Sequence, residues 1–330
     1  MRVGETEMDF LLNDLSFHGQ FTSLGAFKAA IERLMNMRNV ARSFGRELHC
    51  HRDLLRASVM NNMTMQQAVA QFTVDQRRSI QLWMTKSGPF WEDAREHSPD
   101  EWLEHSGSVV TDTAVGEVAW SQKQGSSRAL ISLNPSNWNF SPISVDWCTD
   151  DDAKQTIQVV NYWGCDAFKL ALAQAPRPLQ SWLDLKERAE GHCKNITFAH
   201  DAFEPLNGTP FMLSAANGLL FLAEKLDRFK ACFDVNGQRT SEGNEIYQDF
   251  FTGSKGKGGR GARFTDSSES EKNEFRKELT FKHPTDATQT LLCPWHGKVQ
   301  TPQLRIHFSY PVRAEAPLYV VYVGPKITKR

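Results

Sequence analysis

The stretch LYVVYVGPK (residues 318–326) decides the predicted fold, together with LRIHF (304–308) and PWHGKV (294–299) before it. LRIHF and LYVVYVG are apolar runs rich in β-branched and aromatic residues, a composition typical of β-strands. A loop from Ser309 to Pro317 separates these runs, which predicts that they form an antiparallel pair. The sequence therefore predicts a small sheet at the carboxyl end of the chain.

Basic side chains recur along these stretches, at His296, Lys298, Arg305, His307 and Lys326. Side chains alternate between the two faces of a strand, so His296 and Lys298 share one face, as do Arg305 and His307. If the two faces coincide, the sheet carries a cluster of basic groups that repel one another and favour an anionic ligand. The pattern thus predicts a phosphate-binding site, with a phosphodiester as the candidate ligand.

The composition is that of a globular protein, with 40% hydrophobic and 23% charged residues in 330. The six cysteines are dispersed without CxxC pairing, and no signal peptide or long apolar run is visible. We therefore expect a reduced, cytoplasmic protein without a membrane segment and without a cofactor. His49, Cys50 and His51 are adjacent and cannot all point at one ion, so we predict no metal site there.

The net charge of −1 hides an asymmetry along the chain. Residues 252–330 contain 14 Lys and Arg against 7 Asp and Glu, a balance of +7, which leaves −8 for residues 1–251. The basic end is also the end that carries the candidate site. An acidic body with a basic end favours nucleic acid as the ligand of that end, although a solvated basic surface gives the same count.

The periodicity of the remaining chain predicts an α+β fold whose amino-terminal half is mostly helical with short strands. Ser23 is expected to cap the first helix, whose apolar face contains Phe27, Ile31 and Leu34. Further helices are predicted at 64–71, 74–86, 111–120, 166–175, 182–192, 214–233, 242–251 and 268–279, and strands at 109–110, 129–133, 157–163 and 196–206. We expect two domains, residues 1–190 and 191–330, the second with helices packed on a small antiparallel sheet.

A glycine-rich segment, GSKGKGGRGARF (253–264), interrupts this periodicity. It carries four basic residues, Lys255, Lys257, Arg260 and Arg263, among its glycines. A flexible basic loop suits a phosphate backbone that has no fixed register, so these residues are candidate nucleic-acid contacts. The alternative is an insertion that contacts nothing.

From about residue 196 to 326, the order strand, helices and sheet ending in VGPK resembles the RelE/ParE toxin superfamily. The ribonuclease pattern of that family has a basic pair two residues apart, an arginine seven residues later and a basic residue after a strand ending in Val-Gly. His296 and Lys298, Arg305, and Lys326 hold these positions here, with His296 where the family tends to have lysine and Pro325 before Lys326. The resemblance implies a RelE-like fold and metal-independent cleavage of RNA, including ribosome-associated messenger RNA.

Such cleavage requires a base for the 2′-hydroxyl, cations for the phosphate oxygens and an acid for the leaving oxygen. Histidine titrates near neutrality, so His296 or His307 is the candidate base or acid. Arg305 has the fork geometry for two phosphate oxygens, and Lys298 and Lys326 supply point charges. Each residue also has a plainer interpretation, because His307 can simply pack in the sheet and the lysines can be surface residues.

Other classes of function stay open at this stage. One is a non-catalytic nucleic-acid-binding or protein-interaction component of a bacterial toxin or antiviral (phage-defence) system, in which residues 1–190 bind a partner protein. Another is an enzyme that acts on a small phosphorylated molecule. A third is a toxin-like hydrolase that the acidic first half of the same chain restrains. Nucleic-acid binding is expected to weaken steeply with salt, unlike binding of a small substrate in a deep pocket.

Overall fold

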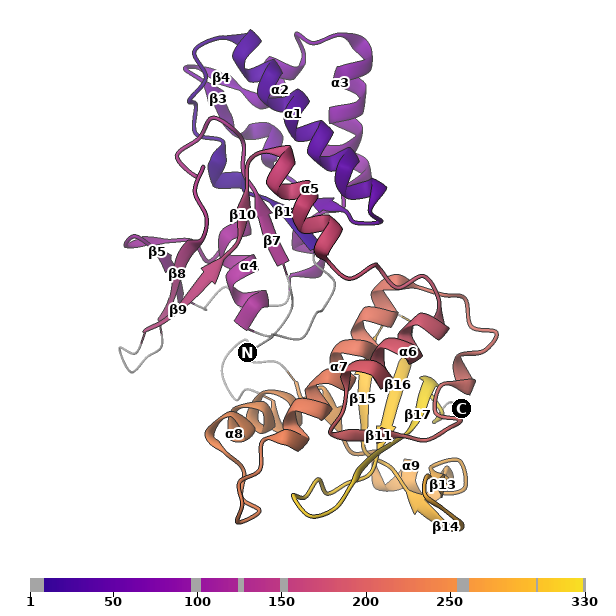
Figure 1. Cartoon of the computed structure of the whole chain (residues 1–330). Coiled ribbons are helices and arrows are strands. Elements are labelled where there is room, and N and C mark those ends of the chain that lie inside the picture. The colour runs from indigo at the N-terminus through magenta and orange to yellow at the C-terminus, as the bar shows by residue number, and fades with distance from the viewer. Residues whose placement is uncertain are drawn as a thin grey trace. The chain divides into compact units, whose positions relative to one another are not determined.

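The computed structural model describes residues 9–95, 102–123, 128–148, 154–253, 261–300 and 302–328. The chain forms two compact units, residues 1–178 and 179–330, each with its own core (Figure 1). The expected boundary at residue 190 falls inside helix α6 (Trp182–His192). This helix packs against α7 (Leu213–Ala231), so it belongs with the second unit.

The first unit is built around a parallel sheet of four strands, in the order β10-β7-β1-β2. Its strands are β1 (Asp9–Leu12), β2 (Leu48–His49), β7 (Arg128–Ile131) and β10 (Asn161–Tyr162). Both faces of β1 are buried, because Phe10 and Leu12 enter one core and Leu11 enters another. A strand covered on both faces reads as a continuous apolar run and gives no alternating pattern.

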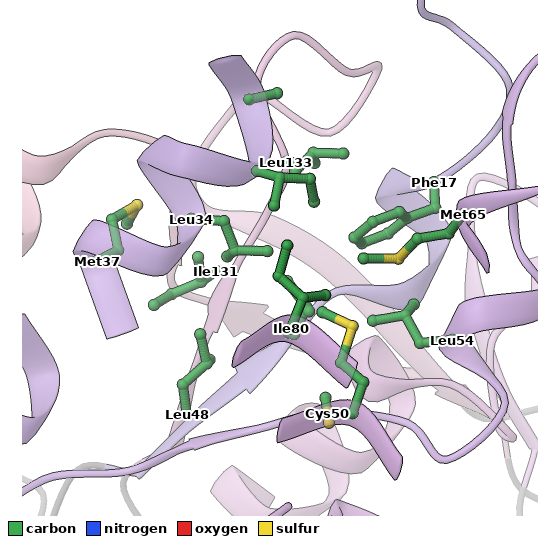
Figure 2. Close-up of a cluster of buried hydrophobic side chains, with 14 of the residues drawn as sticks. Phe17, Leu34, Met37, Leu48, Cys50, Leu54, Met65, Ile80, Ile131 and Leu133 are labelled. Atoms are coloured by element: carbon green, nitrogen blue, oxygen red, sulfur yellow. The ribbon is translucent and has the colours of Figure 1, made fainter. Parts of the chain in front are cut away.

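Helices cover one face of this sheet. They are α1 (Leu24–Ser43), α2 (Met65–Val69), α3 (Val74–Gln81) and α5 (Cys165–Gln174), with a π-helical turn at Leu82–Ser87. Ser23 caps α1 by accepting a hydrogen bond from the amide of Ala26, which confirms the predicted cap. Figure 2 shows Leu34 of α1 with Leu48 of β2 and Ile131 of β7 in this core, where each buried side chain contributes about 1.5–3 kcal/mol.

The other face of the parallel sheet packs on α4 (Ala114–Lys123), which in turn packs on an antiparallel sheet of order β6-β5-β8-β9. Those strands are β5 (Trp102–His105), β6 (Ser108–Val109), β8 (Ile143–Cys148) and β9 (Lys154–Val159). A short hairpin joins β3 (Ser58–Met60) to β4 (Met63–Thr64). The amino-terminal half therefore carries more sheet than predicted, because β1 and β8 are short strands that local pattern did not reveal.

The second unit contains a sheet of five strands, in the order β11-β17-β16-β15-β12. They are β11 (Ile196–Phe198), β12 (Phe264–Thr265), β15 (His296–Val299), β16 (Leu304–Phe308) and β17 (Leu318–Pro325). The predicted pair is confirmed, since β16 and β17 run antiparallel with Ile306 opposite Val323. The sheet is nevertheless mixed, because β11 pairs with β17 in parallel, so the expectation of a purely antiparallel sheet was wrong.

Helices α6 and α7 cover one face of this sheet (Figure 1). Leu304, Ile306 and Phe308 of β16 point into their core, beside Leu222 of α7. Gly297 allows the helix to approach closely, since a Cβ there would lie 2.7 Å from Ile306 and 3.1 Å from Leu222. The neighbouring helix α8 (Ser241–Tyr247) continues as a π-helical turn at Gln248–Thr252.

Against the opposite face lies a hairpin, β13 (Thr280–His283) and β14 (Asp286–Leu292), which follows helix α9 (Glu269–Glu274). Phe281 of β13 contacts the rings of His307 and Tyr322 on that face. Ser268 caps α9 in a capping box, and the helix is shorter than the predicted range 268–279. Among the residues that the structure describes, no helix combines the length and apolar character needed to cross a bilayer.

Candidate anion-binding site

The strand register brings the predicted basic residues together. His296 lies directly opposite His307, and Lys298 lies directly opposite Arg305, across the antiparallel pair β15 and β16. Residues directly opposite each other in such a pair project to the same side of the sheet. The two faces therefore coincide, and we call the side that carries these four residues the basic face.

The neighbouring strands complete the basic face. Thr265 of β12 lies opposite His296, and Tyr322 of β17 lies opposite His307. Gly324 lies opposite Arg305, and a Cβ there would come within 2.6 Å of Pro205 and 2.9 Å of the Tyr322 hydroxyl. One row across the sheet therefore consists of the uncharged groups Thr265, His296, His307 and Tyr322. The next row contains the cations Lys298 and Arg305.

Arg305 is a buried cation that forms no ion pair with a carboxylate among the residues that the structure describes. Its side chain donates to two backbone carbonyls, of Leu304 at 2.8 Å and of Val299 at 3.2 Å, and the residue is 6% exposed. Its Nε atom is buried and has no hydrogen-bond partner among the described residues. Burial lowers the pKa of Arg305, and the charge of Glu271 opposes this effect. An unsatisfied buried cation is costly, so this group favours an anionic ligand.

Two lysines lie near Arg305. Lys298 is partly buried, and both burial and the positive charge of Arg305 lower its pKa. Lys326 follows β17, where its backbone amide donates to the carbonyl of Gln303 at 3.0 Å. The Lys326 Nζ lies 3.5 Å from Oε1 of Glu271. The positive charge of Lys326 also lowers the pKa of Lys298. Lys298 thus lies within electrostatic reach of two other cations, Arg305 and Lys326.

Both histidines of the basic face are held in the neutral form. Nδ1 of His296 lies 3.1 Å from the Pro294 carbonyl, and Nδ1 of His307 lies 2.9 Å from the Cys293 carbonyl. A carbonyl only accepts, so Nδ1 carries the proton in each ring and Nε2 is left as an acceptor. Burial lowers the pKa of His296 to about 4 and that of His307 to about 3.

The two histidines differ in their access to a ligand. The rings lie 5.0 Å apart, but His307 is also enclosed by Phe281 and Tyr322, with ring centroids 6.0 and 5.6 Å away. His307 is 2% exposed and His296 is 7% exposed. This geometry favours packing as the role of His307 and leaves His296 as the candidate acid or base.

Of the four predicted basic residues in the glycine-rich segment, the structure describes Arg263. Lys255, Lys257 and Arg260 lie outside the described residues. The guanidinium of Arg263 lies 5.6 Å from the ring centroid of Phe221, on α7, which covers the opposite side of the sheet. Arg263 is therefore not a member of the basic face.

Sequence reasoning missed Glu271, an acidic residue that acts on the basic face. It lies in the first turn of α9 and approaches Lys326, and its charge acts on His296, Lys298 and Arg305. The Ser268-x-x-Glu271 pattern marks it as a capping residue, but no local signal shows that it faces the sheet.

The described residues contain no group of three or more His, Cys, Asp or Glu side chains placed to hold a metal ion. The described groups of the basic face include three cations that can bind an anion, Lys298, Arg305 and Lys326, and the neutral imidazole of His296, whose Nε2 can accept a hydrogen bond. No protein-family model, curated protein sequence or solved structure matches this chain.

Proposed function

We propose that the basic face binds the phosphodiester backbone of RNA and cleaves it without a metal ion, as the resemblance to the RelE/ParE superfamily implies. The observation that carries this proposal is Arg305, a buried guanidinium with an unsatisfied Nε beside the partly buried Lys298. A phosphate oxygen is a suitable acceptor for such a group, because guanidinium binds phosphate through two parallel hydrogen bonds.

The proposed reaction assigns a task to each group. His296 Nε2 takes the proton of the 2′-hydroxyl, the 2′-oxygen forms a bond to phosphorus, and the bond from phosphorus to the 5′-oxygen breaks. The 5′-oxygen receives a proton from Lys298, whose pKa burial lowers and which is thereby a better acid. Arg305 and Lys326 stabilise the charge on the phosphate oxygens. A bound phosphate carries negative charge and raises the pKa of His296 from its value of about 4.

A second candidate function is RNA or DNA binding without cleavage, as part of a toxin or antiviral system. The observation that favours it is the low pKa of both histidines, since a base that titrates far below neutrality is a weak one. In this case the first unit, residues 1–178, contributes the contact with a partner protein.

The test is incubation of the purified chain with labelled RNA in EDTA, beside the variants His296→Gln and Arg305→Met. Lys282→Met is the control, because Lys282 is an exposed lysine of the same unit. Cleavage that persists in EDTA and in the control, but is lost in both site variants, supports the nuclease. Binding that survives His296→Gln without any cleavage supports the second candidate.

Binding affinity is measured on the same proteins at several salt concentrations. Loss of Arg305 is expected to weaken binding about 10-fold at low salt and to reduce the salt slope by about 1, as for one phosphate contact. Equal affinity of Arg305→Met and the control would contradict both candidates.

A further inference from the structure

Glu271 and Glu269, both in the first turn of α9, differ in what they contact. Oε1 of Glu271 accepts a hydrogen bond from the Thr328 hydroxyl at 2.8 Å and lies 3.5 Å from Lys326 Nζ. Its Oε2 accepts from the backbone amide and the hydroxyl of Ser268, both at 3.2 Å. One oxygen therefore caps the helix while the other faces the end of β17 and the residues that follow it.

The nearby Glu269 shows that a position in the first turn does not by itself impose this role. Glu269 pairs with Lys272 at 2.8 Å, and its side chain is 83% exposed. Glu271 is 31% exposed and acts electrostatically on His296, Lys298 and Arg305. The two glutamates lie in the same helical turn, yet only Glu271 is directed to the basic face.

Glu271 is a fixed negative charge at the edge of the cation cluster. Burial by itself would raise its pKa, but the hydrogen bonds from Thr328 and Ser268 and the charge of Lys326 outweigh this and lower the pKa to about 2. Glu271 is therefore ionised throughout the physiological range. Its distance from Arg305 exceeds ion-pair contact, so it offsets the cluster's repulsion without satisfying the buried Nε.

We infer that Glu271 is a specificity-determining residue of the basic face. Its carboxylate is an internal counter-ion for Lys326 and Arg305, and the phosphates of a bound polyanion replace it there. The inference rests on the proposed RNA-binding function and deepens it. A tethered carboxylate competes at a high effective concentration, so a single free phosphate enters poorly. A chain of phosphates presents several charges at once and displaces it.

The test compares Glu271→Gln with Glu269→Gln, two variants with the same change in net charge. Glutamine still completes a capping box, so Glu271→Gln removes the charge and keeps the cap. Binding of a labelled unstructured oligoribonucleotide is measured by fluorescence anisotropy at low salt. We expect Glu271→Gln to bind at least 5-fold more tightly than wild type, and Glu269→Gln to change affinity less than 2-fold. Equal effects of the two substitutions would overturn the inference.

A second measurement uses inorganic phosphate and thermal unfolding. Ligand that binds only the folded state raises its unfolding temperature by mass action. The rise produced by phosphate is expected to be larger in Glu271→Gln than in wild type or Glu269→Gln, and an equal rise argues against the inference. If Glu271→Gln does not fold, Glu271→Asp takes its place, because the shorter side chain withdraws the carboxylate from Lys326.

The two proposals fail in different ways. If Arg305→Met leaves RNA affinity unchanged, the proposed function fails whatever Glu271 does. If Arg305→Met weakens binding while Glu271→Gln and Glu269→Gln behave alike, only the role of Glu271 is lost.

Discussion

Two buried charges, one in each unit, are bonded in contrasting ways. In the first unit, Glu117 of α4 is fully buried, but Arg128 of β7 lies 2.7 Å from its carboxylate and donates to Ser121 as well. In the second unit, Arg305 is nearly as buried, and its side chain donates to the backbone carbonyls of Val299 and Leu304. The difference teaches that burial of a charge does not by itself mark a ligand site. An unused buried nitrogen does not mark one by itself either, since Arg38 Nε of the first unit also lacks a partner among the described residues. What sets Arg305 apart is that it combines the unused Nε with the neighbouring cation Lys298.

The same contrast holds for uncharged polar groups. At the carboxyl end of the parallel sheet, the Asn13 amide donates to Ser132, and the Ser132 hydroxyl donates to Asn161. The Asn161 amide donates in turn to the carbonyls of Trp138 and Phe140. This series of hydrogen bonds links the ends of β1 and β7 to β10, so its role is structural. The row of neutral groups on the basic face instead leaves Thr265 Oγ1 buried without a partner among the described residues.

The largest expected effect concerns the buried ion pair of Arg128 and Glu117. Arg128→Met removes the cation that lies 2.7 Å from the Glu117 carboxylate, which is expected to lower the free energy of unfolding by about 3–5 kcal/mol. Urea denaturation measures this free energy. The double variant Glu117→Met, Arg128→Met is the control and is expected to recover most of the loss. A single variant as stable as wild type would remove the contrast between the units.

A smaller effect is expected in the neutral network. Asn161→Ala leaves the Ser132 hydroxyl and the carbonyls of Trp138 and Phe140 without their partner, at an expected cost of about 1–3 kcal/mol. The exposed Asn137→Ala is the control for urea denaturation. Equal stability of the two variants would show that the network is not needed.

The third prediction concerns pH and the histidines of the basic face. The pKa of His307 is lowered by burial to about 3 in the folded chain, against about 6.5 when unfolded, so the unfolded state binds more protons between these values. The contribution of His307 to stability is therefore fully present above pH 6.5 and is lost as the pH falls toward 3, by about 1.4 kcal/mol per pH unit. Thermal unfolding at pH 7 and pH 5 is expected to show a smaller decrease in His307→Gln than in wild type. A decrease of the same size in both proteins contradicts this assignment.

The smallest effect has the opposite sign. Arg305→Met removes an unsatisfied buried cation and keeps most of the side-chain volume, so stability without ligand is expected to stay equal or to rise by up to about 1 kcal/mol. The same variant is expected to lose the stabilisation that a short oligoribonucleotide gives to wild type. Urea denaturation with and without the oligoribonucleotide measures both quantities. A large loss of stability without the ligand would show that Arg305 is structural, like Arg128.

Much of the second unit could be predicted from local pattern. The α7 helix and the antiparallel pair β16 and β17 follow from long apolar periodicities. In the first unit, the cap at Ser23 follows from side-chain chemistry, and β7 overlaps the predicted strand 129–133. The parallel sheet itself could not be predicted in this way. β1 is short and buried on both faces, so it shows no alternation, and its pairing with β7 joins segments more than 100 residues apart.

The sequence by itself determined that LRIHF would put Leu304, Ile306 and Phe308 on one side and Arg305 and His307 on the other, because alternation is a property of the extended backbone. Only the tertiary structure decided that Lys298 pairs with Arg305, and His296 with His307, because register depends on contacts between separate strands. Only the tertiary structure placed Glu271 beside Lys326, since the path of the chain from α9 to β17 is set by packing and not by any local preference.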